Sequence, residues 1–111
     1  MKLRLISMVT IAGAIIISPP SFAESVPRYD PDAYCKDVAE FSGGSAVIYS
    51  GCIDSEQDSY NNLKEAWPTL PDAVRSYCDD VARYADGSYV ILEGCVEQEM
   101  KAASSKKQFK F

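Results

Sequence analysis

The residues with the clearest chemical potential are four cysteines, Cys35, Cys52, Cys78 and Cys95. Sixteen residues separate the members of each pair, so the chain lacks both the C-x-x-C spacing of a redox site and the short cysteine spacing of a zinc site. Four cysteines allow three disulfide pairings, and spacing alone does not choose among them. We expect structural disulfides here rather than a metal or redox centre.

Carboxylates are the other candidates for chemistry, because the sequence contains no histidine. A Ser-His-Asp triad, a Cys-His dyad and a histidine-containing zinc site are therefore excluded. Glu56 and Glu99 each follow a cysteine by four residues and share its face of a helix. Neither has an evident partner for acid–base work. We expect them to lie opposite Pro31 and Val74 and to stabilise the N-termini of those preceding helices through the helix dipole.

A calcium loop is a further possibility, because oxygen-bearing side chains fall at the ligand positions of such a loop. These residues are Asp54, Glu56, Asp58, Tyr60, Asn62 and Glu65. Ser59, however, stands where the sharp turn of the loop requires glycine. A continuous amphipathic helix with a solvated acidic face explains the stretch better, so no metal or other cofactor is expected.

All of these cysteines and both glutamates belong to a segment that occurs twice, 43 positions apart. Residues 34–56 read YCKDVAEFSGGSAVIYSGCIDSE, and residues 77–99 read YCDDVARYADGSYVILEGCVEQE. In each copy the two cysteines are equidistant from a central glycine-containing pair. A turn at that pair makes the flanking arms antiparallel and brings the cysteines within disulfide distance. The symmetry favours the pairings Cys35–Cys52 and Cys78–Cys95.

Start and stop signals divide these arms into helices. Asp30-Pro31 and Pro71 are typical helix starts, Ser45 and Ser88 are suitable caps, and Pro68 ends the second helix. Apolar residues recur at helical spacing and are expected to face the core. They are Tyr34, Val38 and Phe41 in the first helix; Ile48, Cys52, Ile53, Tyr60, Leu63 and Trp67 in the second; Val74, Tyr77, Cys78, Val81 and Tyr84 in the third; and Leu92, Cys95, Val96 and Met100 in the fourth.

A β-hairpin competes with this interpretation, because Asp86-Gly87 is a strong hairpin signal and SYVIL is rich in strand formers. The arm before that turn, CDDVARYA, does not alternate between apolar and polar residues, which favours helix. We predict an all-α fold of two tandem, disulfide-stapled, antiparallel helical hairpins with four helices. The repeats span residues 31–66 and 71–103.

Residues 1–23 have the pattern of a cleaved signal peptide. Lys2 and Arg4 precede a 13-residue apolar run, and Ser21-Phe22-Ala23 provides a cleavage site. The run is shorter than the roughly 20 residues of a membrane span, so we expect no stable membrane anchor. The mature chain, residues 24–111, is predicted to be a single small domain with a basic C-terminal tail. Its location would be periplasmic or extracellular, where disulfides persist.

The net charge of residues 24–111 indicates which classes of partner the protein favours. Residues 24–111 contain 16 acidic and nine basic residues, and three of the nine are Lys106, Lys107 and Lys110 in the tail. An acidic body disfavours binding to nucleic acid and to anionic lipid. We therefore expect a protein or cationic partner.

The repeat, written C-x2-V-A-x4-G-S followed by Gly-Cys and a glutamate four residues later, resembles small exported proteobacterial proteins built from cysteine-paired helical-hairpin repeats. Trp67-Pro68 and Leu70-Pro71 are similar to the linkers of such proteins. The resemblance covers residues 31 to about 103 and implies the same fold and an exported location. It implies no catalytic residues.

These observations favour an exported, non-catalytic, disulfide-stabilised binding or structural module. The chain is not expected to be an enzyme. The alternative is a small periplasmic hydrolase that depends on carboxylates, with Glu56 and Glu99 as its candidates.

Overall fold

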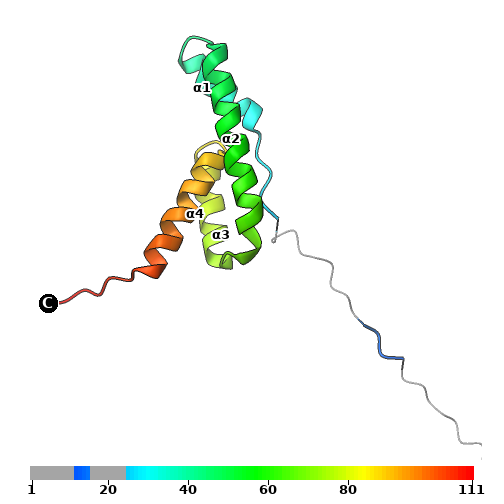
Figure 1. The fold of residues 1–111 in the computed structure, drawn as a ribbon, viewed down its shortest axis with the longest axis vertical. Coiled ribbons are helices and arrows are strands. Elements are labelled where there is room, and N and C mark those ends of the chain that lie inside the picture. Colours follow the sequence, from blue (N-terminus) through cyan, green and yellow to red (C-terminus); the bar gives the residue numbers. More distant parts are fainter. Residues whose placement is uncertain (1–11, 16–24) are drawn as a thin grey trace, which may run out of the picture.

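The structure, a computed structural model, describes residues 12–15 and 25–111. Four α-helices and one short 3-10 helix follow in chain order: α1 (Pro31–Phe41), α2 (Ala46–Ala66), η2 (Trp67–Thr69), α3 (Asp72–Tyr84) and α4 (Tyr89–Ser104) (Figure 1). The described residues include no β-strand, so the predicted all-α fold is confirmed and the competing β-hairpin is wrong.

The predicted signal peptide, residues 1–23, lies outside the described residues except for positions 12–15. Among the helices that the structure describes, none combines the length and the apolar character needed to cross a membrane.

Three of the helices begin where the predicted caps place them. The side chain of Asp30 accepts a hydrogen bond from the Ala33 amide at 3.0 Å, and Ser45 and Ser88 accept equivalent bonds from Ile48 and Ile91 at 3.2 and 3.3 Å. Each bond satisfies an amide that has no partner inside its own helix. The cap signals in the sequence therefore set the helix boundaries.

The turns of the two hairpins depend on glycine. Gly44 and Gly87 have φ angles of +81° and +78°, a backbone conformation that favours glycine. Their amides donate to the carbonyls of Ala39 and Ala82, which closes the ends of α1 and α3. A Cβ added to Gly87 would lie 3.2 Å from the Cβ of Tyr29, so this glycine also admits the chain segment before α1.

Disulfides join Cys35 to Cys52 and Cys78 to Cys95, with Cα–Cα distances of 5.6 and 5.5 Å. The first fastens α1 to α2, and the second fastens α3 to α4. The pairing predicted from the symmetry of the repeat is confirmed. Disulfides of this kind indicate an oxidising compartment.

The long helix α2 is the axis of the molecule (Figure 1). Helix α1 packs along its N-terminal half, while α4 packs against its C-terminal half and α3 in turn packs against α4. The hairpin of α1 and α2 consequently projects beyond the hairpin of α3 and α4. The main core lies where α2, α3 and α4 meet, and consists of Leu63, Trp67, Leu70, Cys78, Ala82, Tyr89, Leu92 and Val96.

The predicted inner faces are only partly right. Leu63, Trp67, Leu92 and Val96 are buried, but Phe41 and Tyr84 are 96% and 95% exposed. The buried residues of α1 are Cys35 and Ala39, and those of α3 are their repeat equivalents, Cys78 and Ala82. Each disulfide draws its two helices together along a seam of small residues. Because successive residues are turned by about 100° around a helix, the tyrosine that precedes each cysteine lies to one side of that seam.

The two disulfides are expected to protect different parts of the molecule. Helix α1 buries only Cys35 and Ala39, so replacing Cys35 and Cys52 with alanine should release α1 while α3 and α4 remain folded. Replacing Cys78 and Cys95 should instead weaken the main core and lower the free energy of global unfolding by about 2–5 kcal/mol. Hydrogen exchange, read helix by helix, distinguishes the outcomes. Equal loss of protection in all four helices of the Cys35/Cys52 variant would contradict this assignment.

Candidate binding surface

A buried carboxylate fixes the second hairpin on the first. Glu56 of α2 is 2% exposed. Its Oε1 accepts a hydrogen bond from the Ser88 hydroxyl at 2.5 Å, and its Oε2 accepts one from the Tyr89 amide at 2.6 Å. Both oxygens thus accept hydrogen bonds at the N-terminus of α4, where the helix dipole favours a negative charge. The expected interaction exists, but the helix involved is α4 and not α1.

The corresponding carboxylate of the second copy has no such role. Glu99 is partly exposed on α4 and makes no side-chain hydrogen bond or ion pair within the part of the chain that the structure describes. The expected interaction with the start of α3 is therefore not observed. Glu56 and Glu99 are equivalent in the sequence and different in their surroundings, so they do not act as a matched pair.

Tyr89, the first residue of α4, extends the contact made by Glu56. Its hydroxyl donates to the carbonyl of Pro27 at 2.8 Å and accepts from the amide of Tyr29 at 2.9 Å. Its ring lies 4.8 Å from that of Tyr29 and 4.9 Å from that of Tyr60, measured between centroids. The segment before α1 is thereby tied to α4. Sequence reasoning missed this residue, and the signal was its contrast with Ala46 at the same place in the first copy.

A cleft of about 270 Å³ lies beside these contacts. It is lined by Arg28, Tyr29, Pro31, Ile53, Glu56, Gln57, Tyr60 and Tyr89. The Tyr29 hydroxyl donates to Asp79 at 2.6 Å, and burial together with this bond raises the pKa of Tyr29. Burial also raises the pKa of Tyr89. Both phenols therefore stay protonated at neutral pH and are engaged within the protein, as is Glu56. The two phenols and the carboxylate that line the cleft therefore already have partners within the protein and are not free to bind a ligand.

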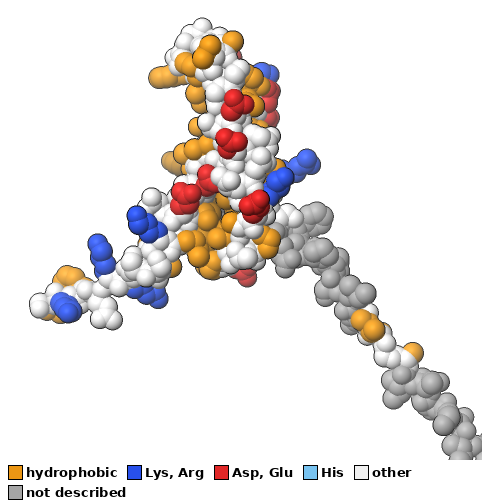
Figure 2. Space-filling model, viewed as in Figure 1, with side chains coloured by type: hydrophobic (Ala, Val, Ile, Leu, Met, Phe, Trp, Pro, Cys, Tyr) orange, Lys and Arg blue, Asp and Glu red, His pale blue; other side chains and the backbone are white. Residues whose placement is uncertain are grey.

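The residues that matched a calcium loop lie on one continuous helix, α2, and do not form a loop. Asp54, Asp58 and Glu65 are exposed along it, and acidic side chains follow the helix in Figure 2. Within residues 12–15 and 25–111, no three cysteine or acidic side chains gather closely enough to hold a metal ion.

The projecting hairpin carries an apolar groove on α1, which we name the α1 groove. It is lined by Tyr34, Asp37, Val38, Phe41, Ser42 and Asp86 and has a volume of about 320 Å³. Tyr34, Val38 and Phe41 form its apolar surface, at spacings of four and three residues along the helix. Asp37 and Asp86 place carboxylates beside that surface. The turn of the second hairpin, which contains Asp86, therefore completes a surface that belongs mainly to the first.

Apolar exposure continues at the far end of this hairpin. Val47 is 82% exposed at the start of α2, and Ile48 is 37% exposed. Apolar side chains gather over this end of the molecule in Figure 2, and Lys and Arg side chains are seen along α4 and the C-terminal tail as well as beside α2. The second hairpin has an equivalent stripe on α3, Tyr77, Val81 and Tyr84. Substitutions in this stripe can therefore serve as controls for substitutions in the α1 groove.

Comparisons with known proteins give no assignment: the chain matches no known family model, and no curated protein or solved structure is detectably similar to it. The geometry described above is therefore the basis for any functional conclusion.

Glu56 is expected to be essential for stability. In the Glu56→Ala variant the Ser88 hydroxyl and the Tyr89 amide would be buried without an acceptor, which should lower the free energy of unfolding by about 3–5 kcal/mol. Glu56→Gln keeps an acceptor and loses the charge, so about 1–2 kcal/mol is expected. Denaturant unfolding of the oxidised protein measures both changes.

The repeat provides the matched control for this experiment. Glu99→Ala should change stability by no more than about 0.5 kcal/mol, because the side chain is partly exposed. A loss at Glu99 as large as that at Glu56 would show that the contacts with Ser88 and Tyr89 are not the source of the effect.

Proposed function

We propose that the protein is a non-catalytic binding module that captures a protein partner through the α1 groove. The observation that carries this proposal is the apolar surface of Tyr34, Val38 and Phe41 on a helix fixed by a disulfide. Phe41 is almost fully exposed, and Tyr34 and Val38 are half-buried beside it. Contiguous exposed apolar surface is typical of sites that bind another protein.

The shape and rigidity of the surface support this role. Phe41 is 96% exposed and borders a groove, so a partner side chain can cover its ring without any change in the fold. Burying a side chain of this size contributes about 1.5–3 kcal/mol. The Cys35–Cys52 bond holds α1 in place before binding, which reduces the entropy lost on association.

The charges around the groove define the chemistry of the partner. Asp37 and Asp86 line it, and residues 24–104 contain 16 acidic residues against six basic ones. A partner segment with an apolar side chain next to a lysine or arginine would match both features. Nucleic acid and anionic lipid lack that match.

The location proposed for this binding is the periplasm or the exterior of the cell. The two disulfides support an oxidising compartment, and the pattern of residues 1–23 supports export. The resemblance to small exported proteobacterial proteins agrees with this location. Intact-mass measurement of the exported protein should show cleavage after Ala23, and a mass that retains residues 1–23 would contradict export by this route.

Capture of a partner by the oxidised protein, residues 24–111, tests the binding function. A partner recovered from native cell-envelope extract should bind the wild-type protein and lose at least about tenfold in affinity to the Phe41→Ser variant. Its affinity should also fall as salt increases, because screening weakens contacts between exposed charges.

The Tyr84→Ser variant is the control, since Tyr84 is equally exposed at the equivalent position of the second hairpin. It should bind like the wild type. Capture that is indifferent to Phe41 would contradict the proposed surface, and turnover of a substrate that disappears in Glu56→Gln or Glu99→Gln would contradict the non-catalytic role.

A further inference from the structure

The C-terminal tail, residues 105–111, has two chemically different edges. It follows α4 without regular structure, and Phe109 and Phe111 are fully or largely exposed. Their ring centroids lie 5.0 Å apart, so the two rings are on the same side of the extended chain. Gln108 and Lys110 alternate with them in the sequence, and Lys106 and Lys107 precede them. The tail thus combines a pair of aromatic rings with a cluster of positive charge.

These properties match those of the α1 groove. Phe109 and Phe111 fit an apolar surface of Tyr34, Val38 and Phe41, and the lysines fit Asp37 and Asp86 at its edge. Three lysines and no acidic residue occur in the tail, whereas the rest of residues 24–111 is strongly acidic. The tail and the groove are therefore complementary in both polarity and charge.

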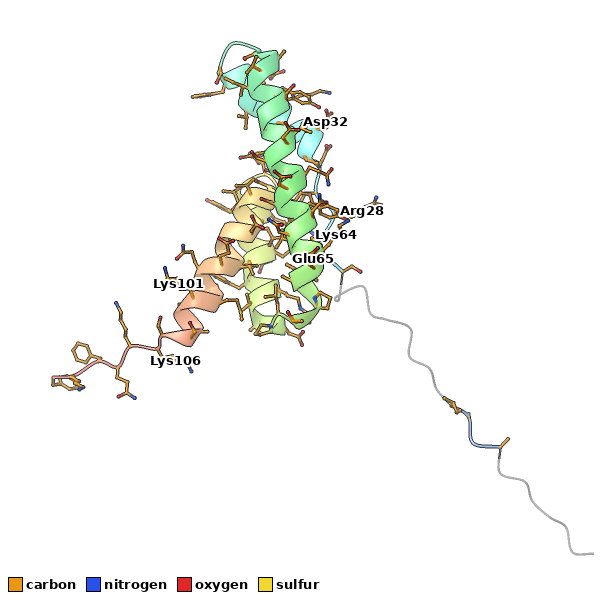
Figure 3. All side chains as sticks on the ribbon, viewed as in Figure 1. Arg28, Asp32, Lys64, Glu65, Lys101 and Lys106 are labelled. Carbon is orange, nitrogen blue, oxygen red and sulfur yellow. A yellow bond between two sulfur atoms is a disulfide. The ribbon has the colours of Figure 1, made fainter. Side chains whose placement is uncertain are left out.

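The tail of the same chain does not reach the apolar part of this groove. Helix α4 begins beside the turn that contains Asp86 and runs away from it for 16 residues, about 24 Å. The seven residues of the tail span at most about 24 Å when fully extended. A tail folded straight back would end at Asp86, at the edge of the groove, and would not reach Tyr34, Val38 and Phe41 on α1. In Figure 3, Lys101 and Lys106 lie on the lower left of the molecule, away from Asp32 of α1.

We propose that the tail of one copy binds the α1 groove of a second copy, so that the protein associates with itself and occupies its own partner site. This inference rests on the proposed function, because it names a ligand for the same groove. The tail then competes with the external partner. Because this contact joins two copies, dilution releases the tail, and a bound external partner displaces it from the groove.

Sedimentation of the oxidised protein, residues 24–111, over a range of concentration tests self-association. The wild type should associate reversibly, and more weakly at high salt. The double variant Phe109→Ser/Phe111→Ser and the single variant Phe41→Ser should each associate at least about tenfold more weakly. Tyr84→Ser should behave like the wild type. Phe41, Tyr84 and the tail are exposed, so none of these changes removes a core side chain.

A mixing experiment makes the test specific. The Phe41→Ser chain keeps an intact tail, and the Phe109→Ser/Phe111→Ser chain keeps an intact groove. Mixed together, they should form a one-to-one pair at concentrations where neither associates alone. Failure to pair, or a wild type that remains monomeric up to millimolar concentration, would overturn the inference. So would a tail that binds anionic vesicles while the protein stays monomeric.

Capture of the external partner distinguishes a failure of self-association from a failure of the proposed binding function. The tail variant should capture the partner at least as well as the wild type, because its groove is free. A monomeric wild type that still binds the partner through Phe41 would remove self-association and leave the binding function intact. Loss of Phe41-dependent capture would remove the binding function itself.

Discussion

The arrangement of the molecule depends on the carboxylate of Glu56. Each hairpin is closed by its own disulfide and turn, but neither device fixes one hairpin relative to the other. The apolar core between α2, α3 and α4 does so together with Glu56, which accepts hydrogen bonds from Ser88 and Tyr89 at the N-terminus of α4. Tyr89 then positions the segment before α1, and the turn beside it brings Asp86 to the α1 groove. A single buried charge therefore links the core to the proposed binding surface.

Local signals in the sequence were sufficient to predict the helices and the pairing of the cysteines. Asp30, Ser45 and Ser88 cap helices as their residue types predict, and the mirror symmetry of each copy identified the correct cysteine pairs. Such features depend on contacts within a few residues or across one turn. Sequence patterns describe contacts of that range well.

The faces of the helices and the contact between hairpins could not be predicted in the same way. Tyr34, Val38 and Phe41 have the spacing of a core face, yet the buried seam of α1 is made of Cys35 and Ala39. Both sets are apolar and lie side by side around the helix, so periodicity does not choose between them. Glu56 and Glu99 likewise have the same sequence context. Only the packing of α4 against α2, a contact between residues 32 or more apart, distinguishes the two.

The platform that α2 offers to α4 is not reproduced in the second copy. Leu63 and Trp67 form that platform, and the residues 43 positions later are Lys106 and Lys110. These two lysines lie beyond the end of α4 at Ser104, so a further hairpin would meet two cations where the second hairpin met leucine and tryptophan. In a repeat protein, a polar outer face of this kind belongs to a capping unit. Of the two copies, the first therefore has an apolar surface on which another hairpin packs, and the second has lysines at the equivalent positions. These lysines belong to the tail that we assign to the groove of a second chain.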